Sequence, residues 1–384
     1  MIKFMSTGII NNKSYIREKE LILDGQKLIW HKERLEAWLR GERIAPITID
    51  CALTRRCTYR CVYCYGQLQA NDEKRMTKDV IFKFLDDAAS IGVKGISFVS
   101  DGESTCSPHL YDAILRGKAN GLDMALGTNA YLLKEDRLKE ILPCLTYLRF
   151  NISAAEPLRY TKIMGCKKEC FSKVYNTIKE CVRIKRENNL SVTLGLQMVL
   201  LPEFSDQIIP FAKLGKELGI DYAIIKHCSD DEKGRLGVNY KKYFDLVDIL
   251  KKAETYSSQD YLVKVKWSKI LSGGKRHYSQ CYGPSFIMQF SGSGLVAPCG
   301  MLFNRRYKKF HIGNIADKSF KEIWKSQRYL DVMNFLSSDK FDAKTMCGAL
   351  CLQHKVNEFL WDLKQGNIGI QSPQGKSPMH INFI

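Results

Sequence analysis

The sequence predicts an α/β protein, in which a parallel sheet built from βα units is followed by a smaller α+β module. Six short apolar runs alternate with amphipathic helical patterns over roughly 180 residues, which is typical of parallel strands joined by helices. Beyond about residue 270 the alternation stops, and two strand-like runs flank a Gly-Ser-Gly turn. The strand pattern alone leaves open whether the sheet is doubly wound or forms a curved, partial barrel.

The elements follow one another in a regular order. Residues 21–46 predict a small strand pair with a turn at Asp24-Gly25, and then an amphipathic helix. The six strands are predicted at 47–53, 95–100, 122–127, 148–153, 192–200 and 222–226. The helices between them are predicted near 77–91, 109–120, 134–142, 169–187 and 205–218. The small module is predicted to hold a hairpin over 285–300 and one helix over 319–336, and the turn-rich C-terminal tail is predicted to lie along the surface.

Composition and charge narrow the class of protein. The chain has 384 residues, of which 45% are hydrophobic, enough for one large and one smaller domain. No apolar run approaches the length of a membrane span and the N-terminal segment lacks a signal-peptide core, so we expect a cytoplasmic protein without a membrane partner. The formal charge of +18 favours an anionic partner, although lysines spread over a solvated surface would give the same total.

Half of the fourteen cysteines fall into two groups. In a reducing compartment, clustered cysteines bind metal or carry out chemistry more often than they form disulfides. The scattered cysteines are expected to be mostly small core residues. The grouped cysteines, which are the candidate metal ligands, are Cys57, Cys61, Cys64, Cys281, Cys299, Cys347 and Cys351.

The first group lies in "CTYRCVYCYG", on the loop that follows the first predicted strand. In βα architectures this edge of the sheet is where ligands bind. A zinc site would need a fourth ligand nearby, and the candidates Cys51 and Cys106 lie on other elements. A [4Fe-4S] cluster normally takes four thiolates, so three would leave one iron open for an exogenous ligand.

This C-x3-C-x2-C spacing, with Tyr63 just before the last cysteine, resembles the signature of radical S-adenosylmethionine enzymes. Further segments in the family's order resemble its cofactor-binding segments: "SDGEST" (100–105), "GTNAYLL" (127–133), "FNISAAE" (150–156) and "LGLQMVLLP" (194–202). The sequence departs from the family pattern at Asp101 and Ala130, where glycine is usual. The resemblance covers roughly residues 47–230.

The resemblance implies a partial (β/α)6 TIM-like barrel with a small C-terminal α+β Twitch/SPASM-like domain. It divides the chain into an N-terminal extension (1–46), the barrel core (47–235), a connecting helix and strand (236–274), the auxiliary cluster domain (275–356) and a C-terminal tail (357–384). It implies that S-adenosylmethionine binds the open iron and is cleaved to a 5′-deoxyadenosyl radical, with a reductant such as flavodoxin or ferredoxin as partner. The residues implied to bind S-adenosylmethionine are Tyr63, Asp101, Gly102, Glu103, Thr128, Asn129, Ser153, Gln197 and Leu201.

The second group of cysteines belongs to the smaller module. Cys281 and Cys299 bracket the predicted hairpin, and Cys347 and Cys351 follow the next helix, so four thiols are expected to close around one metal centre. The layout resembles the Twitch domain, the short form of the SPASM domain, and implies one auxiliary [4Fe-4S] cluster. Zinc and a three-cysteine site are the alternatives, with His354 as a weaker ligand that is expected on the surface.

An auxiliary cluster implies a substrate held between two clusters without naming it. We favour a small, polar, anionic metabolite of the sugar, nucleotide-sugar or aminocyclitol type. Maturation of a precursor peptide is the alternative, although the N-terminal extension looks too short for a leader-peptide domain. Nucleic acid is not expected, because no RNA-binding motif is visible. An iron–sulfur scaffold without enzymatic activity is a lesser alternative.

The candidate catalytic residues are Lys226, Cys228 and Asp230, in the run that ends the sixth predicted strand. Oxidation of the substrate needs a base, for which Lys226 and Asp230 are candidates. Epimerisation needs a hydrogen donor, for which Cys228 is the candidate; the alternative is a buried structural cysteine. Lys226 is also a candidate for holding a phosphate or carboxylate, or for pairing with a neighbouring acid. We favour oxidation slightly, because an auxiliary cluster supplies an electron acceptor.

Overall fold

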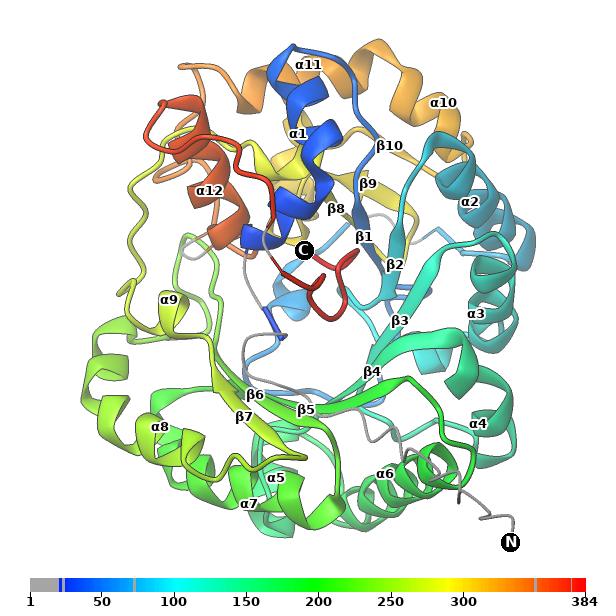
Figure 1. Ribbon diagram of the computed structural model, residues 1–384, viewed down its shortest axis with the longest axis vertical. Helices are drawn as coiled ribbons and strands as arrows, with labels where there is room; N and C mark the ends of the chain where they lie inside the picture. The colour runs from blue at the N-terminus through cyan, green and yellow to red at the C-terminus, as the bar shows by residue number, and fades with distance from the viewer. Residues whose placement is uncertain (1–20, 23–24, 72–73, 349–350, 374) are drawn as a thin grey trace, which may run out of the picture.

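The computed structural model describes residues 21–22, 25–71, 74–348, 351–373 and 375–384. Its strands form one curved sheet in the order β10-β9-β8-β1-β2-β3-β4-β5-β6-β7, with helices on the outside (Figure 1). The predicted α/β partial barrel is therefore confirmed. Residues 1–20 of the predicted N-terminal extension, and Asp24 of the predicted turn, lie outside the described residues.

The barrel strands are parallel and each pairs with its successor in the chain. The strands are β1 (Thr48–Cys51), β2 (Gly95–Phe98), β3 (Asp123–Thr128), β4 (Leu145–Asn151), β5 (Thr193–Leu200), β6 (Tyr222–His227), β7 (Leu262–Val265), β8 (Ile287–Phe290), β9 (Leu295–Ala297) and β10 (Gly313–Asn314). The hairpin strand β8 pairs in parallel with β1, so the barrel and the C-terminal module share one sheet.

Most of the α-helices lie along the outer face of this sheet (Figure 1). The α-helices are α1 (Lys32–Leu39), α2 (Lys78–Ile91), α3 (Leu110–Ala119), α4 (Glu135–Ile141), α5 (Pro157–Met164), α6 (Glu169–Glu187), α7 (Ile208–Leu218), α8 (Val247–Glu254), α9 (Trp267–Ile270), α10 (Phe320–Lys325), α11 (Gln327–Leu336) and α12 (His354–Lys364). Of these, α1 and α12 instead pack on Tyr282, Phe286 and Ile287 at the start of β8. Local signals set their ends: Thr77 accepts a hydrogen bond from the Val80 backbone at the start of α2, and Gly92 ends that helix with φ +98°.

The two faces of the barrel strands differ in polarity. Outward residues such as Ile49, Phe98 and Leu196 belong to the apolar core under the helices. Because side chains alternate along a strand, the residues between them point into the barrel. Inward positions include Asp50 and Arg149, which are only half-buried. The outer face therefore holds the core, and the inner face is free to carry polar function.

Three predicted elements differ in the structure. Residues 25–31 of the predicted N-terminal strand pair form a 3₁₀ helix, Gly25–His31, which packs against α12. The helix predicted over 319–336 is two helices, α10 and α11, because Ser326 is extended and its side chain caps α11. The segment 236–274 contributes a seventh parallel strand, β7, to the sheet.

The last residues of the C-terminal tail, 378–384, enter the barrel at the N-terminal ends of the strands, so the prediction of a surface tail was wrong for them, whereas residues 371–373 and 375–377 are mostly exposed. Figure 1 shows the C-terminus inside the ring of strands. The His380 Nε2 atom lies 2.6 Å from the hydroxyl of Thr193, and the Phe383 ring packs on Tyr147 at 5.0 Å between centroids. Lys27 donates to the backbone oxygens of His380 and Phe383. These contacts close the lower end of the barrel.

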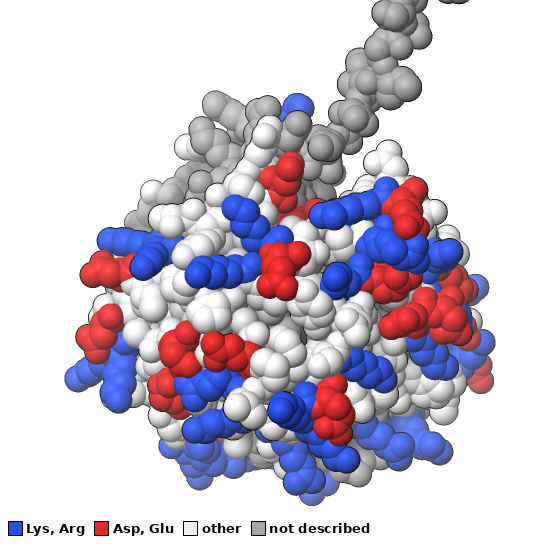
Figure 2. All heavy atoms as spheres, turned by 90° about the horizontal axis from the view of Figure 1, so that it is seen from below, with Lys and Arg blue, Asp and Glu red and all other residues white. Residues whose placement is uncertain are grey.

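The surface charge is mixed on the face shown in Figure 2. There, Lys and Arg side chains are interspersed with Asp and Glu side chains. In the part of the chain that the structure describes, no helix has the length and apolar character needed to cross a membrane.

Candidate active site and auxiliary metal centre

The first cysteine group lies on the loop that follows β1, at the C-terminal edge of the barrel. Cys57 is exposed, and Cys61 and Cys64 are half-buried. Backbone bonds from Arg60 to Gly165 and from Val62 to Ile163 attach this loop to the end of α5. A Cβ on Gly165 would lie 2.1 Å from the Arg60 oxygen, so only glycine permits this approach. The loop thus presents three thiols from a backbone that neighbouring segments fix in place.

Glu103 organises the segments next to this loop. Its Oε1 accepts from the backbone and hydroxyl of Thr105 and, at 2.7 Å, from the hydroxyl of Thr128. Its Oε2 accepts from the Asn129 backbone at 2.8 Å. The Asn129 amide in turn lies 3.9 Å from the Cys57 sulfur. The predicted residues Glu103, Thr128 and Asn129 are therefore brought together beside the three thiols.

Steric constraints act at two small residues of these segments, Gly102 and Ala130. A Cβ on Gly102 would lie 1.9 Å from the Thr54 oxygen, so the segment after β2 packs directly on the cysteine loop. Ala130, which stands where the resembling family has glycine, has φ +64°. This left-handed conformation is one that glycine adopts without strain and alanine does not.

Asp101, the other departure from the family pattern, binds the hairpin. Its Oδ2 accepts from the Ser291 hydroxyl at 2.6 Å and its Oδ1 accepts from the Gly292 backbone at 2.9 Å. Arg55 lies 3.4 Å from the same carboxylate. The contacts of Asp101 therefore attach the hairpin turn to the cysteine loop, and both carboxylate oxygens are engaged.

The remaining predicted cofactor residues lie on β4, β5 and the cysteine loop. Ser153 accepts from the Val199 backbone, and the Gln197 side-chain amide donates to Asn151 at 2.7 Å. Leu201 is buried directly after β5. The Tyr63 hydroxyl is buried and lies 3.1 Å from the Met164 sulfur. Ser153 and Leu201 follow the C-terminal ends of β4 and β5, where the sequence pattern predicts a ligand-binding edge, and Gln197 lies within β5.

The three candidate catalytic residues occupy different environments. Lys226 points into the barrel and is half-buried; burial, followed by the charges of Arg149 and Lys269, lowers its pKa to about 7. Cys228 is fully buried and its thiol donates to the Tyr63 carbonyl at 3.5 Å; burial raises its pKa to about 12. The thiol therefore stays protonated at neutral pH.

Asp230 is buried and organises its own loop. Its carboxylate accepts hydrogen bonds from the backbone N–H groups of Asp231, Leu236 and Val238. Both of its carboxylate oxygens are therefore engaged within this loop. Of the two candidate bases, Lys226 is thus the one whose polar atom is available inside the barrel.

The four cysteines of the second group line one cavity of the C-terminal module. They come from the segment before β8, the end of the hairpin and the segment before α12. The other lining residues include the apolar side chains of Pro298, Met301, Leu302, Leu336 and Phe341. Burial raises the pKa of the Cys281 and Cys299 thiols. Among the described residues no group of His, Cys, Asp or Glu side chains is arranged for a single metal ion.

Hydrogen-bond donors surround these four sulfurs. Arg276 donates to the Cys347 sulfur at 2.8 Å, and the Asn357 amide donates to the sulfurs of Cys281 and Cys351 at 3.6 and 3.5 Å. Lys269 lies nearby and donates to the Leu352 oxygen at 3.1 Å. Donors and positive charges of this kind compensate the charge of a thiolate-bound cluster. The donor set therefore fits an iron–sulfur cluster.

Sequence reasoning missed these donors, because nothing in their local sequence marks Arg276 or Asn357 as a partner of cysteine. It also misplaced His354, which was expected on the surface. The His354 side chain is buried, its Nδ1 lies 3.0 Å from the Tyr278 hydroxyl and its Nε2 faces Glu358. Both ring nitrogens thus have partners other than a metal.

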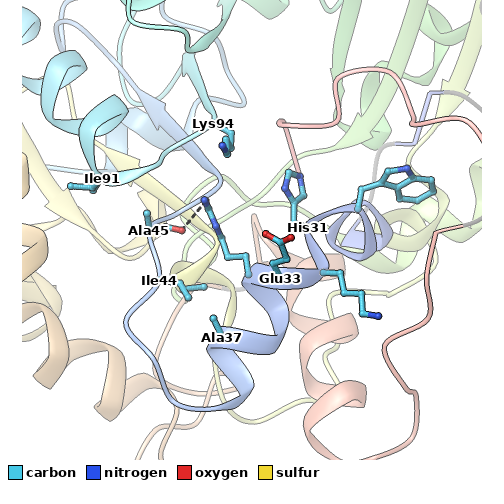
Figure 3. Close-up of a pocket in the computed structure, with 10 residues that line it drawn as sticks. His31, Glu33, Ala37, Ile44, Ala45, Ile91 and Lys94 are labelled. Carbon is cyan, nitrogen blue, oxygen red and sulfur yellow. Dashed lines mark hydrogen bonds between the residues drawn. The ribbon is translucent and has the colours of Figure 1, made fainter.

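A separate hollow of about 550 Å³ lies at the other end of the barrel (Figure 3). Its lining includes His31 and Glu33 from the N-terminal helices, and Ala45 and Lys94 from the segments just before β1 and β2. These positions are at the N-terminal ends of the strands, whereas all the predicted cofactor residues are at the C-terminal ends. We therefore do not assign the chemistry to this hollow.

Comparison with known proteins agrees with this geometry. The radical SAM superfamily matches residues 52–214, and SPASM, the iron–sulfur cluster-binding domain, matches residues 281–352. A tungsten-containing aldehyde ferredoxin oxidoreductase cofactor-modifying protein from Pyrococcus furiosus is 23% identical over 72% of this chain and 80% of its own length. An AdoMet-dependent heme synthase from Methanosarcina barkeri is 24% identical over 81% of this chain and 90% of its own.

Solved structures share the fold. SuiB from Streptococcus suis, a structure with S-adenosylmethionine bound, superposes with a TM-score of 0.61 at 16% identity and covers 84% of this chain and 75% of its own. The cysteine loop falls within the first matched domain, and the cavity of four thiols coincides with the second. The chain belongs to the radical SAM superfamily and carries a C-terminal SPASM iron–sulfur domain, with S-adenosylmethionine and iron–sulfur clusters as its cofactors.

Proposed function

We propose that the protein is a radical SAM enzyme that oxidises or epimerises a small, polar, anionic metabolite. The observation that carries this proposal is the closeness of the two cysteine groups at one end of the barrel. A Cβ on Gly300, the residue after Cys299, would lie 3.0 Å from the Tyr65 hydroxyl, and Tyr65 directly follows Cys64. A substrate above the strands would therefore lie near both groups.

We assign Cys57, Cys61 and Cys64 to the cluster that binds S-adenosylmethionine, and the four cysteines of the second cavity to one auxiliary [4Fe-4S] cluster. When bound, these groups supply a 5′-deoxyadenosyl radical for hydrogen abstraction and a one-electron acceptor. The chain's own residues hold and orient the reactants. Glu103 and Asn129 are next to the open side of the first thiol group, and Gln197 and Ser153 lie on the neighbouring strand ends.

A small anionic substrate has support from charge and from the relatives. The chain carries a formal charge of +18, and Lys226 is a cation inside the barrel. A GTP 3′,8-cyclase from Clostridium perfringens, named for a nucleotide triphosphate, is 29% identical over 46% of this chain. The cofactor-modifying protein and the heme synthase also bear the names of small-molecule pathways.

The reaction type depends on which side chain serves the substrate after hydrogen abstraction. Oxidation needs a proton acceptor, and the neutral form of Lys226, whose pKa is about 7, is a candidate for it. The protonated form is the alternative candidate for holding a phosphate or carboxylate. Epimerisation needs a hydrogen donor, and the protonated Cys228 thiol is the candidate. Because Cys228 is fully buried and donates to the Tyr63 carbonyl, its environment favours a structural role, and we favour oxidation.

The test is release of 5′-deoxyadenosine by anaerobically reconstituted protein with dithionite and S-adenosylmethionine. We expect slow release without substrate, and stimulation by the true substrate from a panel of phosphorylated and carboxylated sugars and cyclitols. In deuterated water, oxidation leaves no solvent deuterium on the product carbon, whereas epimerisation through a thiol places one there. No release from a fully reconstituted protein would overturn the assignment in favour of an iron–sulfur scaffold.

Peptide maturation is the second candidate, because SuiB, which shares the fold, has also been seen with its precursor peptide SuiA. In the same assay, stimulation by a precursor peptide and not by any member of the metabolite panel would replace the small-molecule proposal.

A Cys228→Ala variant separates oxidation from epimerisation. We expect it to turn over normally if the enzyme oxidises its substrate, and to cleave S-adenosylmethionine without forming the epimer if the enzyme epimerises it.

A further inference from the structure

The inner face of the barrel carries a group of cations, here called the lumen cations: Arg149, Lys226 and Lys266. Arg149 on β4 and Lys226 on β6 alternate with outward residues of the core, so they point inward. Lys266 directly follows β7, in phase with Leu262 and Lys264. All three cations are half-buried, although they lie on strands whose outward residues are buried. Solvent-accessible space therefore reaches into the barrel at these positions.

The floor beneath the lumen cations is closed and aromatic. The Arg149 guanidinium stacks over the Tyr147 ring at 4.9 Å, and Tyr147 packs on Phe383 and His380 of the C-terminal tail. Tyr222 packs on His380 from the side of β6. Among the described residues, the tail thus covers the barrel from below, which leaves the C-terminal ends of the strands, where the cysteine loop lies, as the approach for a ligand.

The lumen cations repel one another and are not neutralised within the fold. Burial, followed by the charges of Arg149 and Lys269, lowers the pKa of Lys226 to about 7, while Cys228 and Asp50 act in the opposite sense. Burial, followed by the charges of Lys269, Lys226, Arg149 and Lys27, lowers the pKa of Lys266 well below its usual range. Asp50 is the carboxylate on the same inner face, and its side chain accepts from Gln289 at 3.1 Å. The Nε atom of Arg149 is buried without a hydrogen-bond partner. Like charges held close together and a buried donor without a partner both raise the free energy of the folded state. A bound anion would offset both costs.

Two neighbouring lysines, in contrast, have hydrogen-bond partners within the fold. Lys264 also points inward from β7, and its ammonium donates to the Leu21 oxygen at 2.9 Å. Lys269 donates to the Leu352 oxygen and lies beside the sulfurs of Cys351 and Cys299, so its charge serves the auxiliary group. Among the described residues, Arg149 donates from Nη2 to the Tyr147 hydroxyl at 3.4 Å, and the ammonium groups of Lys226 and Lys266 donate to none of them.

We infer that Arg149, Lys226 and Lys266 bind an oxyanion of the substrate, a phosphate or a carboxylate, inside the barrel. The identity of this anion as part of the substrate rests on the proposed function. Arg149 offers a planar fork of donors that suits either oxyanion, and the two lysines supply further charge. The anion anchors one end of the substrate below the cysteine loop, and the auxiliary group lies to one side, where Gln289 joins Asp50 to the Gly300 backbone.

The test uses isothermal titration calorimetry at constant ionic strength. The reconstituted holoenzyme, saturated with S-adenosylmethionine, is titrated with inorganic phosphate and, separately, with succinate, and the dissociation constant of each anion is measured. We expect at least one anion to bind, and the stronger of the two identifies the phosphate or the carboxylate class. Lys226→Met should weaken binding by about tenfold or more, the usual value of a charge-assisted contact. Arg149→Lys, which keeps the charge and removes the fork, should weaken it less.

Lys185→Met is the matched control, because Lys185 is a partly buried lysine paired with Asp221 on the outer side of the barrel. It removes the same charge from the protein and should leave anion binding unchanged. Three results would overturn the inference: no binding of either anion with or without S-adenosylmethionine, equal binding by the Lys226→Met and Lys185→Met variants, or anion binding that appears only when S-adenosylmethionine is left out. The last result would assign the lumen cations to the cofactor's own carboxylate.

Measuring the release of 5′-deoxyadenosine without substrate, alongside anion binding, tests the proposed function and this inference separately. We expect the Lys185→Met control to release 5′-deoxyadenosine at the wild-type rate and to bind the anion as the wild type does. A wild-type protein that binds the anion but releases no 5′-deoxyadenosine would overturn the proposed enzyme and leave the anion site intact. A wild-type protein that releases 5′-deoxyadenosine but binds neither anion would overturn the anion site and leave the proposed enzyme intact.

Discussion

The two cysteine groups of this protein use the same ligand atom in opposite settings. The first presents three thiols from one loop, with Cys57 exposed at the barrel edge. The second brings four thiols from three segments around a cavity with apolar walls, where Arg276 and Asn357 donate to the sulfurs. Three thiols on an open loop leave a place for an exogenous ligand, whereas four thiols with donors around them complete the coordination from the protein.

The largest effect is expected from removing the first group. Replacing Cys57, Cys61 and Cys64 by alanine should abolish release of 5′-deoxyadenosine and leave about half of the iron, because the second group stays intact. Iron analysis and chromatography of the reaction mixture measure both. Cys144→Ala, at a partly exposed cysteine whose thiol faces the Glu140 carbonyl, is the control and should change neither. Release by the triple variant would refute the assignment.

Removing the second group should have a different consequence. With Cys281, Cys299, Cys347 and Cys351 replaced by alanine, about half of the iron should again remain, but release of 5′-deoxyadenosine without substrate should persist while product formation stops. Since four substitutions in one cavity can disturb folding, Cys347→Ala alone gives a milder form of the test. Zinc in place of iron in the wild-type cavity would contradict the comparison.

An intermediate effect is expected from the donors around the second group. Arg276→Met removes a positive charge that donates to the Cys347 sulfur, so the reduced, more negative cluster loses stabilisation. The reduction potential of the auxiliary group should fall by about 60 mV, a tenfold change for a one-electron couple, with the iron content unchanged. Arg276→Lys keeps the charge and should shift the potential less. Redox titration followed by electron paramagnetic resonance measures it, and an unchanged potential would count against the role of the donor.

Anion binding by the lumen cations should depend on pH. Lys226 has a pKa of about 7, lowered by burial and by Arg149 and Lys269 against Cys228 and Asp50, and burial raises the pKa of Asp50 to about 6. An anion favours the protonated lysine, so its binding takes up protons. Affinity for sulfate, which does not titrate in this range, should fall by about tenfold from pH 6 to pH 8 as Lys226 loses its proton.

The step in sulfate affinity should disappear near pH 7 in the Lys226→Met variant. A contribution from Asp50 alone would instead lie near pH 6, because protonation of that carboxylate removes its repulsion of the anion. Affinity that rises with pH in the wild type would contradict the sign of the prediction.

The smallest effect concerns the turn beside the first group. Ala130 has φ +64°, so Ala130→Gly should stabilise the fold by about 1 kcal/mol. Gly165→Ala should do the opposite and by more, because its φ is +59° and a Cβ there would lie 2.1 Å from the Arg60 oxygen. The urea midpoints of the two variants measure the difference. Equal midpoints would mean that neither turn is strained as its φ indicates.

The sequence predicted the features that depend on local pattern. The βα alternation placed the strands and helices, since each element needs only its own hydrophobic period. Cys57, Cys61 and Cys64 were recognisable because all three ligands lie on one loop. Their neighbours Glu103, Thr128 and Asn129 come from successive strand ends, and the regular order of the fold brings such ends together.

The features that sequence reasoning missed depend on contacts between distant segments. Asp101 looked like a departure from a cofactor-binding turn, but its carboxylate binds the hairpin turn at Ser291 and Gly292. The tail looked like a surface segment, because nothing local shows that Thr193 and Tyr147 would receive His380 and Phe383. The lumen cations likewise lie on different strands, so only the curvature of the folded sheet reveals that they share one inner face.

The most direct test of the comparison is electron paramagnetic resonance of the reduced, reconstituted protein with and without S-adenosylmethionine. The account predicts signals from two clusters, of which S-adenosylmethionine alters only one, and that signal should be missing when Cys57, Cys61 and Cys64 are replaced by alanine. The remaining signal should be the same with and without S-adenosylmethionine. A single cluster signal in fully reconstituted protein, or a response to S-adenosylmethionine by the cluster that survives those substitutions, would contradict the account.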